Sequence, residues 1–162
     1  MLTITQVDFN NPQHCADLLR LLNNYALDPM GGGEALSAYA QENLIRELSQ
    51  RNIISSFIAY VDGQAAGFSN CIEGFSTFAC KPLLNIHDFA VNPEFRGHGI
   101  AKALLNAIDE LARAKGCCKI TLEVLQGNLP AKQLYEAMGF AVYELDPEMG
   151  GALFMQKKLE GK

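Results

Sequence analysis

Apolar positions recur with different periods along the chain, and these periods predict its secondary structure. Alternation over residues 2–7 predicts a first strand. Apolar residues three or four positions apart then predict a helix over residues 12–26, capped by Asn11, and a second helix over residues 34–49. The stretch 28–33 is rich in proline and glycine, which disfavour helix, so it separates the two.

The second half of the chain changes to short apolar runs that are separated by turn residues. Further strands are predicted over residues 56–61, 65–73, 83–91, 119–124, 141–145 and 152–158, and further helices over residues 99–115 and 128–138. The strand–helix–strand order of residues 83–124 predicts a parallel pair with a right-handed crossover. We therefore expect an α/β fold with one mixed, mostly antiparallel sheet of about seven strands and helices on both faces.

Length and composition limit the classes of function. A chain of 162 residues with 49% hydrophobic and 19% charged residues fits one domain, which we expect over residues 1–162. The net charge of −5 opposes non-specific binding to nucleic acid or anionic lipid. No apolar run approaches the about 20 residues that a membrane-spanning helix needs, and no signal-peptide pattern is present. The five cysteines and three histidines lack metal-site spacing. We expect a cytoplasmic protein without metal, nucleic-acid or membrane partners.

Residues 91–101, with the sequence VNPEFRGHGIA, carry the clearest chemical signal. A buried strand ends here, two glycines follow, and an amphipathic helix begins. Because the first N–H groups of a helix lack partners and its dipole favours negative charge, this bend predicts an anion site. Gly97 and Gly99 allow a diphosphate to touch the backbone, while Arg96 and Lys102 add positive charge. A glycine turn with nothing bound is the alternative.

Two motifs in this region resemble the signatures of the GNAT N-acetyltransferases. Arg96-x-x-Gly99-x-Ala101 is similar to the acetyl-CoA motif Arg/Gln-x-x-Gly-x-Gly/Ala of that family. Residues 128–140, NLPAKQLYEAMGF, are similar to its motif Asn-x-x-Ala-x-x-Leu-Tyr-x-x-x-Gly-Phe. The resemblance covers residues 55–158 well and the first 50 residues loosely. It implies the GNAT fold, in which a central pair of parallel strands splays apart around acetyl-CoA.

The resemblance also implies a role for each matched residue. Acetyl-CoA, the co-substrate, would lie between the strand that ends at Val91 and the strand over residues 119–124. The residues expected to bind it are Phe89, Ala90, Val91, Arg96, Gly97, His98, Gly99, Ile100, Ala101, Lys102, Asn128 and Lys132. A helix cap is an alternative or additional role of Asn128. Tyr135 occupies the general-acid position of the family, where its phenol would protonate the departing thiolate; a core tyrosine is the alternative.

The general base is less strongly indicated. The run Ile86-His87-Asp88-Phe89-Ala90-Val91 is similar to Leu-Glu-Asp-Phe-Phe-Val of the diamine (spermidine/spermine) acetyltransferase branch, with His87 in place of the acidic residue. His87 could relay a proton directly or through water, and a core imidazole bonded to a backbone carbonyl is the alternative. Strand alternation predicts that His87 and Asp88 point to opposite faces.

The reaction implied by the resemblance is direct transfer of an acetyl group from acetyl-CoA to a primary amine of a small molecule, of the amine or amino acid type. Acetylation of a protein N-terminus or lysine, and a non-catalytic acyl-CoA-binding sensor, are the alternatives. Residues 28–34 fall where the family shapes its acceptor site, and their glycines predict a mobile rim. The last strands could also pair across a two-fold axis and form a homodimer.

Overall fold

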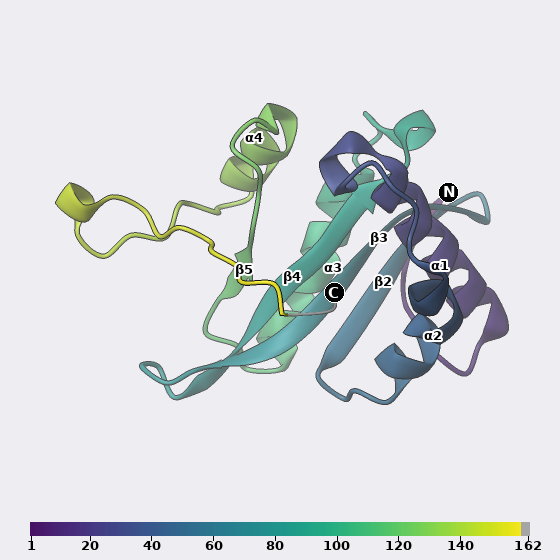
Figure 1. Cartoon of the computed structure of the whole chain (residues 1–162), viewed down its shortest axis with the longest axis horizontal. Coiled ribbons are helices and arrows are strands. Elements are labelled where there is room, and N and C mark those ends of the chain that lie inside the picture. Colours follow the sequence, from purple (N-terminus) through teal and green to yellow (C-terminus); the bar gives the residue numbers. More distant parts are fainter. Residues whose placement is uncertain (160–162) are drawn as a thin grey trace. The chain divides into compact units, whose positions relative to one another are not determined.

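Five strands form one mixed sheet in the structure, a computed structural model that describes residues 1–159. They are β1 Leu2–Gln6, β2 Ile54–Val61, β3 Gln64–Ser76, β4 Lys81–Val91 and β5 Ile120–Leu122. Their order in the sheet follows the sequence, and all neighbours are antiparallel except β4 and β5 (Figure 1). The predicted α/β class and the parallel pair are therefore confirmed. The pair lies at the edge of this sheet, however, and not at its centre.

The helices follow the predicted order. They are α1 Pro12–Leu27, α2 Ala38–Ser49, α3 Ile100–Ala114 and α4 Leu129–Ala137, with short 3-10 turns η1 Pro29–Gly31, η2 Pro93–Phe95 and η3 Pro147–Met149. Asn11 caps α1 as predicted, because its side chain accepts hydrogen bonds from two N–H groups of the first turn. Helix α2 begins later than predicted. Its cap is Ser37, whose hydroxyl oxygen accepts a hydrogen bond from the N–H of Ala40 at 3.1 Å.

Helices pack on both faces of the sheet, as predicted (Figure 1). On one face, α1 and α2 bury apolar side chains against β2 and β3. This cluster contains Leu18, Leu21, Leu48, Ile58 and Phe68. Helix α3 packs against the sheet from the other side through Ile100, Leu104, Leu105, Ile108 and Ala112. The strand ends that carry the candidate chemistry are thus supported from two sides.

The structure divides the chain into two compact units, Met1–Leu122 and Glu123–Lys162. The first contains the whole sheet with α1, α2 and α3, and the second contains α4 and η3. The single domain over residues 1–162 stays a prediction. Within the described residues, no helix combines the length and the apolar composition that crossing a membrane requires.

Two of the predicted strands, over residues 141–145 and 152–158, do not form in the part of the chain that the structure describes. The backbone bond recorded between them joins the N–H of Ala152 to the carbonyl of Tyr143 at 2.8 Å, and one bond is not a ladder. Apolar residues of both segments are exposed, so their alternation meets no buried face. An isolated strand pair is marginal in water, which explains why the pattern alone misled. The homodimer stays a prediction.

Candidate active site

Strand β4 extends well beyond its parallel neighbour β5. The two strands pair over three positions, and the last pair is Ile86 with Leu122. β4 then continues to Val91 while β5 ends. The edge of β4 that faces away from β3 therefore runs on past the end of β5.

A β-bulge in β4 decides which residues face the neighbouring strand. Cys71 pairs with Ile86, whereas the preceding residue Asn70 pairs with Asp88, so His87 is an extra residue without an opposite partner. Strict alternation would place Ile86 and Asp88 on the same face, but their partners are consecutive in β3 and lie on opposite faces. The bulge interrupts the alternation on which the faces of His87 and Asp88 were predicted, so their opposite orientation stays a prediction.

The same bulge sets the direction of the peptide groups at the end of β4. The N–H of Asn92 donates to the carbonyl of Ala66, on the β3 side, at 2.8 Å. Because N–H groups alternate in direction along a strand, that of Val91 points to the other side, toward the open edge. The amide group of Val91 is thus directed to the place where the thioester of a bound acyl-CoA is expected.

The bend after η2 has the geometry of an anion site. Gly97 and Gly99 have φ of +83° and +76°, in the left-handed region that favours glycine. A Cβ added to either residue would meet nothing within 4 Å, so the space beside both is open. Gly99 caps α3 without any side-chain hydrogen bond, and the N–H of Ala103 is the first to find a backbone acceptor, the carbonyl of Gly99 at 3.1 Å. In the described part of the chain, the N–H groups of residues 100–102 have no recorded acceptor and can bind an anion.

Three side chains of this bend were expected to assist the anion site. His98 and Lys102 are exposed, and Nδ1 of His98 lies 3.1 Å from the carbonyl oxygen of Phe95. Arg96 is engaged on two sides. Its Nε donates to the carbonyl of Val91 at 3.1 Å, and its Nη2 lies 3.7 Å from Oδ2 of Asp28, at the end of α1. The sequence offered no sign of this ion pair.

A chain of polar side chains holds Asp88 in place across three strands. Nδ2 of Asn70 donates to Oδ2 of Asp88 at 3.0 Å, and the hydroxyl of Ser56 donates to Oδ1 of Asn70 at 2.6 Å. Ser56 and Asn70 are buried, with 1% and 4% of their surface exposed. Such a buried and satisfied network keeps the carboxylate of Asp88 in one orientation. Asp88 was assigned no catalytic role from the sequence.

A second carboxylate, that of Asp28, acts together with Asp88 on the phenol of Tyr25. Burial raises the pKa of the Tyr25 phenol, and the negative charges of Asp88 and Asp28 raise it further. The end of α1 and the end of β4 therefore contribute two carboxylates that both act on one side chain. The backbone is tightly packed here, because a Cβ on Gly31 would lie 2.0 Å from the carbonyl oxygen of Tyr25. The carboxylates of Asp28 and Asp88 thus both oppose ionisation of the Tyr25 phenol.

His87 is exposed on the bulge and makes no recorded hydrogen bond within the described residues. The alternative of a core imidazole bonded to a backbone carbonyl is therefore wrong. Its role as a proton relay stays a prediction.

The remaining predicted residues belong to the second unit. Asn128 caps α4, since its Oδ1 accepts from the N–H of Ala131 at 3.4 Å. Its amide nitrogen takes no part in this cap. Tyr135 is buried, and its ring meets the ring of Phe140 edge to face at 5.8 Å. Lys132 is half-buried in α4. The roles of these residues in cofactor binding and acid catalysis stay predictions.

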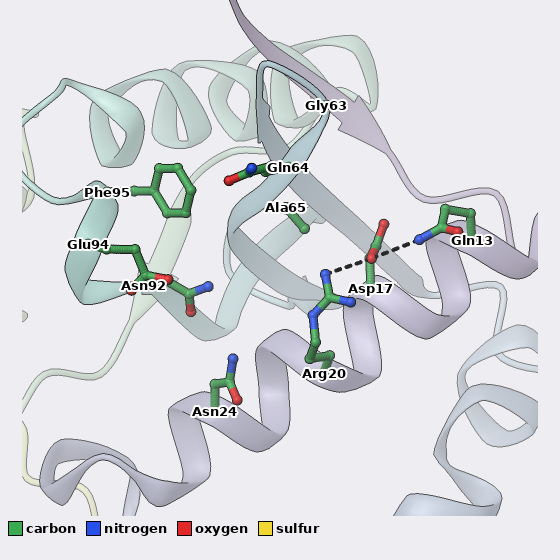
Figure 2. A pocket seen from close by; sticks show the side chains of 10 residues that line it. All are labelled: Gln13, Asp17, Arg20, Asn24, Gly63, Gln64, Ala65, Asn92, Glu94 and Phe95. Atoms are coloured by element: carbon green, nitrogen blue, oxygen red, sulfur yellow. Dashed lines mark hydrogen bonds and ion pairs between the residues drawn. The ribbon is translucent and has the colours of Figure 1, made fainter.

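A polar cleft of about 390 Å³ lies apart from the predicted residues, between α1, the turn after β2 and η2 (Figure 2). Gln13, Asp17 and Arg20 line it from α1. Asp17 is 3% exposed, and its carboxylate accepts hydrogen bonds from Gln13, from Arg20 and from the hydroxyl of Tyr60 in β2. The bond from Tyr60 ties α1 to the sheet, which is a structural role.

The bond between Tyr60 and Asp17 predicts a stability that depends on pH. Burial, then the hydrogen bond to Asp17, raises the pKa of Tyr60 to about 12 from its ordinary value of 10. Its contribution is therefore complete below pH 10 and is lost as the pH rises toward 12. We expect Tyr60→Phe to lower the free energy of unfolding by about 1–2 kcal/mol at pH 8, and by less at pH 11.

Urea unfolding followed by circular dichroism at both pH values measures this difference. Tyr39→Phe, at an exposed position of α2, is the matched control. If Tyr60→Phe lowered the free energy of unfolding by the same amount at pH 8 and at pH 11, this result would contradict the prediction.

The first unit is thus an α/β sheet with an open strand edge that leads directly into an anion-binding bend. A model of the Acetyltransferase (GNAT) family matches residues 18–140. The chain therefore belongs to the GNAT acetyltransferase family, whose typical co-substrate is acetyl-CoA. This confirms the family to which the two motifs pointed.

Several curated proteins are similar to this chain. Streptothricin acetyltransferase of Streptomyces lavendulae is 36% identical over 66% of this chain and 53% of its own length. An uncharacterized N-acetyltransferase of Methanocaldococcus jannaschii is 32% identical over 69% of this chain and 49% of its own length, so the chain spans about half of these two relatives. Thialysine N-epsilon-acetyltransferase of Caenorhabditis elegans is 27% identical over 80% of this chain and 78% of its own length. The likeness to the diamine acetyltransferase branch stays a prediction.

Solved structures share the fold. An aminoglycoside acetyltransferase from an uncultured soil metagenomic sample, in complex with sisomicin, has a TM-score of 0.78 and 21% identity over 98% of this chain and 97% of its own. An aminoglycoside N-acetyltransferase in complex with CoA has a TM-score of 0.74 and 24% identity over 98% and 96%. At this identity the likeness supports the fold alone.

Proposed function

We propose that this chain transfers the acetyl group of acetyl-CoA to a primary amine of a small, positively charged molecule. The observation that carries the proposal is the continuity of three features: the open edge of β4, the anion-binding bend after it, and the carboxylates of Asp28 and Asp88 on the adjoining face. The named activities of the relatives support a small-molecule acceptor, because streptothricin and thialysine acetyltransferases are among them.

The cofactor end of the proposed site uses the backbone. The N–H groups of residues 97–102 hold the diphosphate, and the open edge of β4 binds the pantetheine arm over Phe89, Ala90 and Val91. When the amine attacks the thioester, its carbonyl oxygen becomes negatively charged. The N–H group of Val91, which points to this edge, donates a hydrogen bond to that oxyanion and lowers the barrier.

The acceptor end needs a neutral amine, although an alkylammonium with a pKa of about 10 is charged at neutral pH. We assign the attraction of the ammonium to Asp88 and Asp28, and its deprotonation to His87, directly or through water. Tyr135 donates the proton that the departing CoA thiolate takes up. Direct transfer requires no covalent acetyl-enzyme.

Two measurements test the proposal in order. Calorimetry on the full chain should detect binding of CoA. An assay of free thiol should then detect turnover with acetyl-CoA and a panel of spermidine, thialysine, glucosamine 6-phosphate, an aminoglycoside and an N-terminal peptide. We expect turnover with cationic small amines and little with the peptide. No heat with CoA would refute the proposal, and binding without turnover of any acceptor would favour the sensor.

A further inference from the structure

The ion pair between Arg96 and Asp28 connects the cofactor end of the site to its acceptor end, so its role rests on the proposed function. Arg96 belongs to the anion-binding bend, and Asp28 begins the glycine-rich loop after α1. Their charged atoms are 3.7 Å apart, and the side chains are 58% and 29% exposed. Because water reaches both groups, this pair is weak and either partner can exchange it for a stronger one.

Asp28 stays in place whether or not Arg96 is bound to it. Its Oδ1 accepts from the N–H of Met30 at 2.9 Å, and its carbonyl accepts from the N–H groups of Gly31 at 2.8 Å and Gly33 at 3.0 Å. Oδ2 is the oxygen that meets Arg96. One oxygen therefore holds the loop, while the other is available for exchange.

Arg96 is similarly anchored at one end of its guanidinium. Its Nε donates to the carbonyl of Val91, so the group lies at the end of β4, beside the bend where the N–H groups of α3 begin. A diphosphate bound at that bend carries at least two negative charges. Charge-assisted hydrogen bonds to it are stronger than a contact of 3.7 Å with one exposed carboxylate.

We propose that Arg96 changes partners when the cofactor binds: the diphosphate takes the guanidinium, and the released Oδ2 of Asp28 then binds an ammonium group of the acceptor. The released carboxylate lies on the face where Asp88 and Asp28 both act on Tyr25. The exchange makes the two ligands help each other. By linkage, the cofactor raises the affinity for a cationic acceptor by the same factor by which the acceptor raises the affinity for the cofactor.

The first test measures CoA binding by calorimetry in Asp28→Asn. Asparagine keeps the cap on Met30 but removes the charge, so the loop should remain folded, which circular dichroism verifies. We expect CoA to bind about two- to fivefold more tightly, because Arg96 no longer has a competing partner. Glu94→Gln is the matched control: it removes the same charge from η2, two positions before Arg96, at a side chain that has no recorded ion pair among residues 1–159. Equal changes in both variants would overturn the proposal.

The second test measures the acceptor. The substrate is the amine of the panel that gives the highest kcat/KM. For this amine we expect Asp28→Asn to raise KM about tenfold with a much smaller change in kcat. Glu94→Gln should leave both constants nearly unchanged. In the Arg96→Gln background, Asp28→Asn should no longer tighten CoA binding, because the competition is gone. Persistent tightening there, or an unchanged acceptor KM, would overturn the exchange. Failure of the wild-type chain to bind CoA would instead refute the proposed function itself.

Discussion

Asp88→Asn should lower kcat/KM for a small cationic amine about a hundredfold and leave the Kd of CoA within about twofold. Asn70 donates a hydrogen bond to this carboxylate, and the buried hydroxyl of Ser56 donates one to Asn70. Because these side chains are fixed, no neighbouring group can move in and replace the lost negative charge. Removing one charge of a close, partly desolvated pair costs about 2–5 kcal/mol, and about 2.7 kcal/mol corresponds to a factor of one hundred.

The free-thiol assay measures kcat and KM, and calorimetry measures the Kd of CoA separately. Asp109→Asn is the matched control, because it removes an exposed carboxylate whose recorded partner is Arg113 in α3. A loss of CoA affinity parallel to the loss of kcat/KM would mean that the substitution disturbs β4 as a whole. A kcat/KM within about threefold of wild type would remove Asp88 from the acceptor site.

Tyr135→Phe should reduce kcat by about a hundredfold or more while the affinity for CoA changes little. A positioned general acid contributes about 10²–10⁴ to a rate. Phenylalanine preserves the edge-to-face contact with Phe140, so the loss should come from the hydroxyl group alone. The wild-type chain should also lose activity at high pH as the acid deprotonates, and this limb of the profile should disappear in Tyr135→Phe.

Steady-state turnover between pH 6 and pH 11 measures both effects, with Tyr39→Phe as an exposed control. If Tyr135→Phe turned over at the wild-type rate, another donor or water would protonate the thiolate. A lowered kcat with an unchanged high-pH limb would assign Tyr135 to packing, the alternative that its burial also permits.

Several parts of the site could not be predicted because they depend on register. Nothing in the run Ile86-His87-Asp88 marks His87 as an extra residue, since a bulge exists only relative to the strand that it pairs with. Its consequences are the contact of Asp88 with Asn70 and the direction of the Val91 amide. Both arise from pairing between β3 and β4.

Alternation also misled where no partner was present. The segments 141–145 and 152–158 have the pattern of strands, but in the described part of the chain they make no ladder and bury no face. The start of helix α1 was predicted correctly, because it depends only on Asn11 and on residues within one turn of it. The cap signal at Asn11 was therefore reliable by itself, whereas alternation predicted strands correctly only where a partner strand was present.

The sequence by itself determined the order of the elements, the glycine bend between β4 and α3, and the two motifs that identified the family. These features are local, because a cap, a glycine with positive φ or a short motif is complete within a few consecutive residues. Only the tertiary structure decided that Asp88 contacts Asn70, that Arg96 forms an ion pair with Asp28, and that β4 extends beyond the end of β5. Those contacts join residues far apart in the chain, and their geometry follows from strand register and helix packing.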